Sequence, residues 1–467
     1  MHARNETLHR YTRPVTRRHK TTVDGPRTSR TKAQPAPALL LLHCPERGVV
    51  TDERVTLPIG RTLIGREVEE GEGIGLEDAR ASRLHATLHV ASRSRRVRIA
   101  DEDSKNGTFV NGERVEEAWL SNGDVVRLAD THFLLRVTDD ETRDADVAGL
   151  LGSAPSMRAL RATVAQVGPH DVTVLLAGES GSGKEVVARA IHVLSGRTGA
   201  FVAVNCAAIP EQLAESQLFG HVAGAFTGAR GDHPGFFRSA HLGTIFLDEI
   251  GDLDIRLQPK LLRALEQRCV VPVGAAHPVP CDARIVAATH RDLAAAVDAD
   301  QFRGDLYARL AEFSITVPAL RDRREDVLPL LRHAYGERMP SLSPDLVQAL
   351  LTYDWPFNVR ELLAVGRELL VRGADRDKLE LELVAHRLGD AGDGDEGDDG
   401  DDRISEGTGR RSTGERATPP TREEFERILS DCKGNVRAIA RETGRSRMQV
   451  YRWIEQYGLD LEQYRDK

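Results

Sequence analysis

The stretch that decides the fold is Gly178–Glu185, "GESGSGKE". It follows the apolar run Val172 to Ala177 and opens a helical run, so it reads as the turn from a buried strand into a helix. Glycines at such a turn let backbone N–H groups point inward and hold phosphate oxygens, while Lys184 reaches the β and γ phosphates of a nucleotide. The sequence predicts an ATP-binding loop formed by Gly178, Glu179, Ser180, Gly181, Ser182, Gly183, Lys184 and Glu185.

The match to the phosphate-loop pattern is incomplete at its last position. Glu185 stands where the pattern has a Ser or Thr, whose hydroxyl normally helps to hold Mg²⁺. Taken alone, the loop is therefore a moderate match, and a glycine-rich turn between a strand and a helix is the alternative.

Two adjacent acids end another apolar run, "TIFLDEIG", at Thr244 to Gly251. Burying Asp248 and Glu249 after four apolar residues is costly without a cation. We therefore expect Asp248 to hold Mg²⁺, directly or through water. Glu249 would polarise the attacking water as a general base. The alternative is a solvated turn, against which the apolarity of the strand argues.

The segment "QFRGDLYARL" supplies two arginines six residues apart, Arg303 and Arg309. An arginine delivered by a neighbouring subunit can neutralise charge on the departing phosphoryl group. If this segment stood alone, two surface arginines on a helix would be the favoured interpretation.

Strand-like and helical runs alternate over residues 147–318, which predicts an α/β subdomain with a buried parallel sheet. Residues 319–389 are helical in pattern, and Ser343-Pro344 is typical of a helix start. Residues 38–138 have short alternating runs separated by three Asn-Gly pairs, at Asn106, Asn111 and Asn122. Because Asn-Gly is a strong hairpin signal, this part is predicted to be an all-β sandwich.

The remaining segments differ in composition from these domains. Residues 1–37 are basic and predicted to be a disordered arm, and residues 390–418 form an acidic, Gly/Asp-rich linker predicted to be disordered. The linker carries eight carboxylates between Asp390 and Asp402, which equals the whole net charge of −8. The rest of the chain is near neutral, so the charge does not exclude nucleic-acid binding. Residues 419–467 are predicted to form three short helices.

Length and composition also indicate the number of domains and the cellular compartment. A length of 467 residues suits about three domains. The best apolar run, Ala38 to Leu42, is far too short to cross a membrane. Five scattered cysteines fit a reducing cytosol, so we expect a cytoplasmic protein with no membrane partner.

Residues 147 to about 389 resemble the AAA+ domain of bacterial enhancer-binding activators of sigma-54 RNA polymerase. The motifs that carry the resemblance occur in family order: "GESGSGKE", "NCAAIP", "GAFTGA", "LDEIGDL", "AATHRDL", "FRGDLYARL" and "WPFNVREL". The resemblance implies an ATPase with a helical lid. It also implies that Arg303 and Arg309 act on a neighbouring subunit, and hence a homo-oligomeric ring, usually a hexamer.

The same resemblance assigns further roles. Asn205 is similar to the switch residue that reports the γ-phosphate state to Glu249. Thr289 and His290 occupy the first sensor position, and Arg360 resembles the second sensor. Three positions depart from the family pattern, namely Gln217, Phe357 and Arg238. Phe357 replaces a glycine, and its larger side chain could shift Arg360.

The "GAFTGA" motif resembles the loop that grips sigma-54 in this family. Two glycines frame an apolar ring, which suits a pliable tip that rises and retracts with the nucleotide state. A buried packing loop is the alternative. The predicted sigma-54 contact is formed by Gly224, Ala225, Phe226, Thr227, Gly228 and Ala229.

The N-terminal sandwich resembles a forkhead-associated (FHA) domain, through "IGR", "SRLH" and "SKNGTFVNG". Arg66, Ser82 and Arg83 would bind the phosphate of a phosphothreonine, and Asn106 would hold the peptide backbone. The implied partner is a phosphothreonine-containing protein in a Ser/Thr kinase pathway. His85 and Gly107 are expected to be architectural. A sandwich that only packs on the ATPase is the alternative.

The C-terminal unit resembles the Fis-type helix-turn-helix of the same activators. The recognition helix would present polar side chains to base edges and phosphates of enhancer DNA. The predicted DNA-binding residues are Arg445, Ser446, Arg447, Gln449 and Arg452.

Together these features predict a multidomain protein: an FHA-like β-sandwich, an α/β AAA+ ATPase with a helical lid, and an all-α DNA-binding domain. We expect an ATP-driven, sigma-54-dependent transcription activator that uses ATP and Mg²⁺. Two alternatives remain open at this point. One is a non-catalytic DNA-binding regulator whose AAA+ fold only oligomerises, and the other is an AAA+ remodeller with a different target.

Overall fold

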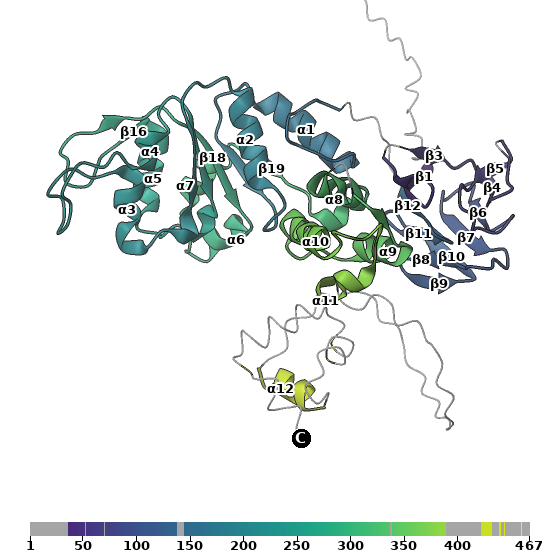
Figure 1. Cartoon of the computed structure of the whole chain (residues 1–467). Helices are drawn as coiled ribbons and strands as arrows, with labels where there is room; N and C mark the ends of the chain where they lie inside the picture. The colour runs from purple at the N-terminus through teal and green to yellow at the C-terminus, as the bar shows by residue number, and fades with distance from the viewer. Residues whose placement is uncertain are drawn as a thin grey trace, which may run out of the picture. The chain divides into compact units, whose positions relative to one another are not determined.

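The computed structural model describes residues 36–51, 53–69, 71–137, 144–336, 339–388 and 422–431, together with 439, 443 and 459. The chain divides into two compact units, Met1–Asp395 and Glu396–Lys467, which are considered separately (Figure 1). The predicted basic arm, up to residue 35, and the predicted acidic linker lie outside the described residues.

The N-terminal part of the first unit is a sandwich of two β-sheets, as predicted. One sheet has the order β2-β1-β12-β11-β8-β9, with β3 beside β1, and the other has the order β10-β7-β6-β4-β5. The first sheet contains β1 (Pro37–Cys44), β2 (Gly48–Val49), β3 (Arg54–Thr56), β8 (Thr108–Val110), β9 (Glu113–Val115), β11 (Val125–Leu128) and β12 (Thr131–Val137). The second contains β4 (Gly60–Gly65), β5 (Gly73–Gly75), β6 (Ala86–Val90), β7 (Val97–Asp101) and β10 (Glu117–Leu120).

The three Asn-Gly pairs serve two different kinds of turn. Asn111 and Gly112 have φ values of 51° and 92° and close the tight hairpin between β8 and β9. The pairs that begin at Asn106 and Asn122 instead connect a strand of one sheet to a strand of the other. A hairpin interpretation is therefore wrong for two of the three pairs, because positive φ at Gly107 and Gly123 serves a crossover equally well.

The middle of the unit is built on a five-stranded sheet of order β14-β15-β18-β13-β19, in which every neighbouring pair is parallel. This confirms the predicted α/β fold. The strands are β13 (Val174–Ala177), β14 (Phe201–Asn205), β15 (Thr244–Asp248), β18 (Arg284–Thr289) and β19 (Phe313–Thr316).

Alternate residues of these strands pack against two different groups of helices. Val174 and Leu176 of β13 join one apolar cluster with α1 and α2, whereas Leu175 joins the cluster on the other face. The first face is covered by α1 (Pro155–Val167) and α2 (Lys184–Leu194). The second is covered by α3 (Glu211–Phe219), α4 (Gly235–Ser239), α5 (Gln258–Gln267), α6 (Leu293–Asp298) and α7 (Gly304–Leu310), and a small hairpin of β16 (Cys269–Val270) and β17 (Val279–Pro280) follows α5. Burial on both faces explains why the strands are almost continuously apolar.

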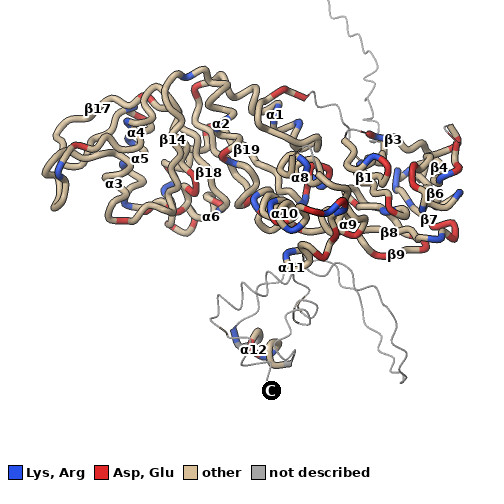
Figure 2. Tube along the Cα trace, viewed as in Figure 1, with Lys and Arg blue, Asp and Glu red and all other residues tan. Residues whose placement is uncertain are grey.

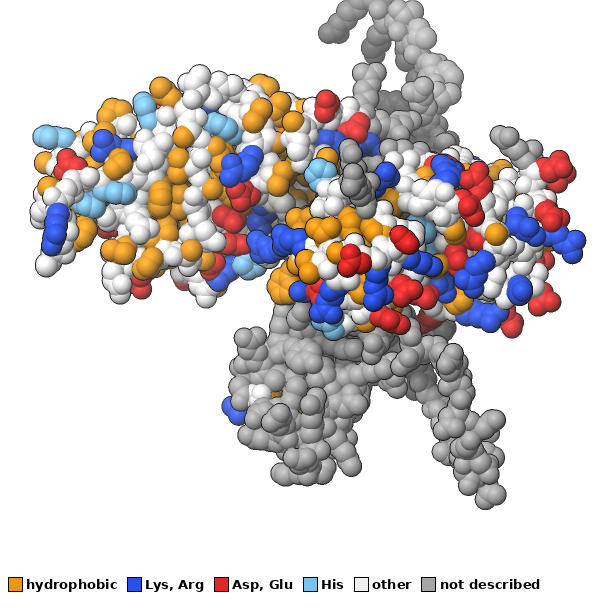
Figure 3. Space-filling view, viewed as in Figure 1, with side chains coloured by type: hydrophobic (Ala, Val, Ile, Leu, Met, Phe, Trp, Pro, Cys, Tyr) orange, Lys and Arg blue, Asp and Glu red, His pale blue; other side chains and the backbone are white. Residues whose placement is uncertain are grey.

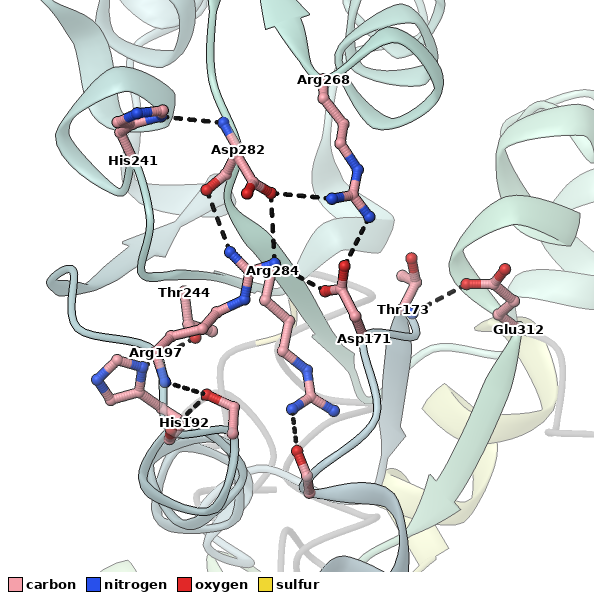
Figure 4. A network of polar contacts seen from close by, with 12 residues as sticks. Asp171, Thr173, His192, Arg197, His241, Thr244, Arg268, Asp282, Arg284 and Glu312 are labelled. Carbon is pink, nitrogen blue, oxygen red and sulfur yellow. Dashed lines mark hydrogen bonds and ion pairs between the residues drawn. The ribbon is translucent and has the colours of Figure 1, made fainter. Parts of the chain in front are cut away.

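The amino-terminal edge of the parallel sheet is held by a network of arginines and aspartates (Figure 4). Asp171 accepts hydrogen bonds from Arg268 over 2.6 Å and from Arg197 over 2.8 Å, and Arg268 also donates to Asp282 over 3.0 Å. Burial by itself raises the pKa of Asp171, but the two arginines outweigh it, and the net pKa is lowered. This network joins loops far apart in sequence at the edge of the sheet opposite the glycine-rich loop.

A helical lid follows the sheet. It contains α8 (Val327–Tyr335), α9 (Pro344–Thr352), α10 (Asn358–Arg372) and α11 (Ala385–Leu388), with a short pairing of β20 (Ser341–Leu342) and β21 (Lys378–Leu379). The predicted start at Ser343-Pro344 is confirmed, because the Ser343 hydroxyl accepts a hydrogen bond from the N–H of Leu346 over 3.2 Å. Trp355 is fully buried in the lid core.

Charges of both signs are interspersed over the described part of the first unit (Figure 2), and charged and hydrophobic side chains mix on the face of the lid drawn in Figure 3. Among the described residues, no helix has the length and apolarity needed to span a bilayer. Cys44, Cys206, Cys269 and Cys281 are free thiols.

In the second unit the structure describes α12 (Arg422–Asp431), which lies in the part predicted to form short helices. Phe425 and Leu429, one helical turn apart, are fully buried. The predicted DNA-binding residues, Arg445, Ser446, Arg447, Gln449 and Arg452, lie outside the described residues.

Candidate functional site

The phosphate loop lies at the carboxyl edge of the parallel sheet, between β13 and α2. Gly181 has a φ of 74°, and a Cβ atom built on it would lie 2.2 Å from the carbonyl oxygen of Phe357 in the lid. Glycine is therefore required there both for backbone conformation and for the close approach of the lid. The loop leads into the amino-terminus of α2, where free N–H groups favour an anion.

Lys184 is buried at the base of the loop. Its Nζ donates hydrogen bonds to the carbonyl oxygens of Gly178 over 2.9 Å and of Glu179 over 3.2 Å. The same Nζ lies 3.8 Å from Oε1 of Glu249. The structure thus brings together the predicted phosphate-binding lysine and the predicted general base.

Asp248 ends β15, and Glu249 follows it with a φ of 50°, which is unusual for a residue that is not glycine. Burial, and then the charge of Glu249, raise the pKa of Asp248. A cation that binds here would relieve this cost. The described residues contain no cluster of three or more His, Cys, Asp or Glu side chains suited to a metal. One or two carboxylates that share the ion with phosphate oxygens are what Mg²⁺ commonly uses, so Asp248 fits that role.

Glu249 is contacted by His290 rather than by the predicted switch residue. Nδ1 of His290 lies 2.6 Å from Oε2 of Glu249. The Asn205 side-chain oxygen instead accepts a hydrogen bond from the N–H of Ala207 over 3.0 Å and caps the short helix that follows it. In the structure, the predicted first sensor residue His290 therefore contacts the predicted general base, and Asn205 is turned toward its own backbone.

The side chain of Arg360, in the lid, reaches the phosphate loop as the resemblance implies. Nη1 of Arg360 donates to the hydroxyl of Ser180 over 3.1 Å, which suits a second sensor. Phe357 has ordinary backbone angles, with φ of −108° and ψ of 21°, so the replacement of glycine causes no strain. Arg360 contacts the loop with Phe357 in the position where the family pattern has glycine.

Two residues that were not predicted from the sequence tie the lid to the phosphate loop. Arg321 donates to both carboxylate oxygens of Glu179, over 2.6 and 2.8 Å. Asn358 is fully buried, and its amide nitrogen donates to Glu179 Oε2 and to the carbonyl oxygen of Ser180, each over 3.1 Å. Nothing local in the sequence marks these contacts. The one available signal was that Asn358 follows directly on Phe357 within the second-sensor motif.

Arg303 precedes α7 and Arg309 lies in its last turn, and their side chains are 44% and 39% exposed. Arg303 pairs with Asp305 and Arg309 with Glu312, both on the same chain. Ion pairs between exposed side chains contribute little to stability, so these pairs hold the two arginines only weakly. Glu185, the unusual last residue of the phosphate loop, is also half-exposed and pairs with Arg189 one turn further along α2.

The "GAFTGA" stretch forms a closed, exposed turn. The N–H of Gly224 donates to the carbonyl oxygen of Ala229 over 2.8 Å, and the Phe226 side chain is 41% exposed. Its ring touches the His221 ring edge-on at a centroid distance of 5.0 Å. The loop therefore presents the aromatic ring to solvent and is not a buried packing loop.

In the sandwich, the predicted phosphothreonine-binding residues lie on adjacent loops. The N–H of Arg66 donates to the carbonyl oxygen of Ser82 over 3.0 Å, and the Ser82 hydroxyl accepts from the N–H of Lys105, next to Asn106, over 3.1 Å. Arg66 and Arg83 are exposed. His85 is fully buried and its ring joins the N–H of Ser82 to the carbonyl oxygen of Gly107, an architectural role as expected.

Arg80 is a further basic side chain at this site that the sequence analysis missed. The Asn106 amide donates to the carbonyl oxygen of Arg80 over 2.6 Å. The Arg80 guanidinium lies 3.5 Å from Oδ1 of Asn106 and pairs with Asp130 over 3.2 Å. Arg80 thus connects the residue predicted to hold a peptide backbone with the turn between β11 and β12.

Three family models match the chain in the order of these structural parts. The FHA domain model matches residues 62–129, the Sigma-54 interaction domain model matches residues 150–316, and the AAA+ ATPase lid domain model matches residues 321–398.

Similar proteins come from several bacteria. The putative uric acid sigma-54-dependent transcriptional regulator UacR of Escherichia coli K12 is 46% identical over 241 residues, which are 50% of this chain and 40% of UacR. The transcriptional regulatory protein GlrR of the same strain is 38% identical over 346 residues, 70% of this chain and 71% of GlrR. The crystal structure of NtrX from Brucella abortus in complex with ADP is 29% identical, covers 66% of this chain and 70% of NtrX, and has a TM-score of 0.48.

The chain thus spans less than half of the length of UacR. Its agreement with GlrR extends over more than two thirds of both chains and includes the whole edge of the sheet described above. The chain therefore belongs to the sigma-54-dependent transcriptional regulators, and it carries an FHA domain ahead of its AAA+ domain.

Proposed function

We propose that the chain is an ATP-hydrolysing activator of transcription by sigma-54 RNA polymerase. The observation that carries this proposal is the convergence of Lys184, Asp248, Glu249 and Arg360 at one edge of the sheet. Nζ of Lys184 lies 3.8 Å from Glu249, which is covalently next to Asp248, and Arg360 reaches Ser180 of the same loop. A cation, a metal-holding acid, a base and a lid arginine at one anion-binding loop are the groups that nucleotide hydrolysis needs.

Each of these residues has a distinct part in the proposed reaction. Lys184 and the loop N–H groups bind the phosphates, and Asp248 holds Mg²⁺, which offsets phosphate charge when bound with ATP. Glu249 accepts a proton from the attacking water. Arg303 and Arg309 of a neighbouring subunit stabilise the charge that develops on the γ-phosphate, which requires a ring of subunits, for which we propose a hexamer.

ATP hydrolysis is proposed to move the exposed loop that carries Phe226. We propose that this loop, Gly224 to Ala229, contacts sigma-54 and opens the promoter complex as nucleotide is hydrolysed. The exposed ring and the two positive-φ glycines, at 80° and 104°, support a mobile apolar contact.

Two further partners are proposed, one for the FHA domain and one for the C-terminal residues. We propose that Arg66, Ser82, Arg83 and Asn106 bind a phosphothreonine-containing protein from a Ser/Thr kinase pathway. We propose that enhancer DNA is bound by the C-terminal residues Arg445, Ser446, Arg447, Gln449 and Arg452. Both partners, like the polymerase, belong to the cytoplasm.

Phosphate release from ATP by the wild-type chain and by Lys184→Ala tests the catalytic part. Activity that is lost in the variant supports hydrolysis, whereas equal near-zero rates point to a regulator whose AAA+ fold only oligomerises. In vitro transcription with the sigma-54 holoenzyme tests the target, and a chain that hydrolyses ATP without opening a sigma-54 promoter would be a remodeller of another protein.

A further inference from the structure

The sheet of the FHA domain that contains β1, β11 and β12 is apolar on both of its faces. Leu39 and Leu41 of β1 point into the sandwich core, but Leu42 belongs to the apolar cluster of the lid. In β12, Phe133 and Leu135 likewise join the sandwich core, whereas Leu134 joins the lid cluster. A sandwich strand with one wet face alternates between apolar and polar residues, so the outer face of this sheet is built to be covered.

The lid of the same chain covers that face. Helix α9 packs against β11 and β12, and α8 packs against β2. The FHA side chains in the lid cluster are almost completely buried: Leu42 (4% exposed), Val49 (8%), Val125 (0%) and Leu134 (0%). At the margin, Arg127 of β11 donates to Asp345 of α9 over 2.9 Å.

One buried ion pair crosses this interface. Nε of Arg136, in β12, donates to Oε1 of Glu325 over 2.9 Å, and Nη2 donates to Oε2, so the pair is bidentate. The side chains are 11% and 2% exposed. Removal of one partner would leave the other charge buried and unpaired, which is strongly unfavourable.

Glu325 belongs to a four-residue segment, Arg323–Asp326, which we name the junction segment. Its side chains extend to three different parts of the molecule. Arg324 donates to the carbonyl oxygen of Gly123 in the FHA domain, and Glu325 binds Arg136 there. Arg323 donates to the carbonyl oxygen of Ser182 in the phosphate loop over 3.0 Å.

The remaining member of the junction segment, Asp326, holds the backbone that leads into α1. Its Oδ1 accepts hydrogen bonds from the N–H groups of Ser153 over 2.6 Å and of Ala154 over 3.0 Å. Burial raises the pKa of Asp326 to about 6. Thus the residues that touch the FHA domain, the phosphate loop and the entry to α1 are consecutive along the chain.

The phosphothreonine side of the FHA domain reaches the same interface. Arg80, which contacts Asn106, pairs with Asp130 in the turn between β11 and β12. Two residues further on, His132 is fully buried, and β12 then supplies Leu134 and Arg136 to the lid contact.

We propose that the outer face of the FHA domain is a regulatory docking surface for the lid of its own chain, and that the junction segment transmits the docked state to the phosphate loop. The proposal rests on the proposed nucleotide-binding function of that loop. In the docked state the pair of Arg136 and Glu325 fixes the junction segment, so that Arg323 stabilises the Ser182 carbonyl. Loosening the contact releases the loop and weakens nucleotide binding.

The test uses amide hydrogen exchange of the full chain without nucleotide, which reports the interface and the phosphate loop separately. Arg136→Met is expected to speed exchange about 5-fold or more both in α9 and at residues 178–184. The matched control is Arg98→Met, because Arg98 pairs with Glu117 on the other sheet with 41% and 53% exposure. The control should leave both segments unchanged.

A double variant distinguishes a specific effect of the ion pair on the phosphate loop from a general loss of stability. Arg136→Met with Glu325→Met replaces the buried pair by apolar side chains and should restore most of the protection. Asp345→Arg supplies a milder lesion, since Asp345 is 73% exposed and would face Arg127 with like charge. It should speed exchange in the same two segments even if Arg136→Met does not fold. Faster exchange in α9 with an unchanged phosphate loop, or no change in either segment, would overturn the proposal.

Titration with MgADP then separates this proposal from the proposed function. If the wild type binds MgADP, the dissociation constant of Asp345→Arg should rise by a factor similar to its change in exchange, by linkage. If the wild type binds none, the proposed function fails, while the exchange data still decide whether docking reaches the loop.

Discussion

The side-chain amide of Asn358 lies 3.1 Å from Oε2 of Glu179, so the first residue of α10 is bonded to the second residue of the phosphate loop. The Asn358 oxygen accepts a further hydrogen bond from the N–H of Leu320 over 2.8 Å. One buried amide therefore holds the lid, the loop and the connection between them.

Asn358→Ala should weaken both the fold and nucleotide binding. The change leaves the buried Leu320 N–H unpaired and places an alanine at a φ of 52°, which together should cost about 1–3 kcal/mol of unfolding free energy or slightly more. Asn358→Gly is the matched control, because glycine accepts this φ and removes only the amide. Urea unfolding and MgADP titration measure the two effects. An unchanged dissociation constant in both variants would contradict a role of Asn358 in the nucleotide site.

Glu249→Gln should separate binding from hydrolysis. The amide cannot accept a proton from water, so ATP turnover should fall by about 10²–10⁴-fold while nucleotide binding remains. Steady-state phosphate release and nucleotide titration give the two numbers. Glu266→Gln, at an exposed glutamate of α5, should behave as wild type. Turnover of Glu249→Gln within a factor of two of wild type would assign the base to another group.

A mixing experiment tests whether Arg309 acts on a neighbouring subunit. Lys184→Ala lacks the phosphate lysine and Arg309→Ala lacks the finger, so each variant alone should be inactive. Mixed rings contain interfaces with an intact lysine from one subunit and an intact arginine from the next, and phosphate release should reappear. The double variant Lys184→Ala/Arg309→Ala mixed with Lys184→Ala is the control. A mixture of the two single variants that stays inactive, although mixed rings form, would show that Arg309 does not act across the subunit interface.

Phe226→Ala should uncouple hydrolysis from promoter opening. The ring is 41% exposed, so its loss should change stability little, and the catalytic residues are untouched. We expect ATPase activity close to wild type and loss of sigma-54-dependent open complexes, measured by in vitro transcription. Val371→Ala serves as the control, at a hydrophobic residue of α10 that is 77% exposed. Normal transcription by Phe226→Ala would refute the assigned role of the loop.

Acid should destabilise the FHA domain and its contact with the lid through His132. Burial lowers the pKa of His132 well below its usual 6.5, with the charges of His43 and Arg127 adding to the effect. Below pH 6.5 the unfolded chain takes up a proton that the folded chain does not, so stability falls as the pH falls. The slope is about 1.4 kcal/mol per pH unit for one such group.

The check is urea unfolding between pH 7.5 and 5, which are assay conditions chosen to span this window. The pKa of His43 is also lowered, chiefly by burial, so His132→Leu should reduce the slope without abolishing it. His89→Leu, at an exposed residue of β6, should leave it unchanged. Identical slopes in wild type and His132→Leu would show that His132 does not bear the effect.

The sequence predicted the fold wherever the signal was local. Strand alternation, the glycine-rich loop after β13 and the helix start at Ser343 each depend on residues within a few positions of one another, and all three are confirmed. The two Asn-Gly pairs at the sheet crossovers show the limit of such signals. Positive φ is encoded locally, but which strand the chain meets after the turn is not.

Some features of the candidate site were likewise predictable from the sequence, and others were not. The sequence by itself determined which residue types line it, because Asp248 and Glu249 stand at the end of an apolar strand and Lys184 follows the glycine-rich loop after another. Only the tertiary structure decided that His290 rather than Asn205 contacts Glu249, and that Asn358, 179 residues away, bonds to Glu179. The outer face of the FHA sheet is the clearest case. Its apolar residues can be recognised in the sequence. That the lid covers them is seen only in the tertiary structure, because the two segments are far apart in the chain and no short-range pattern connects them.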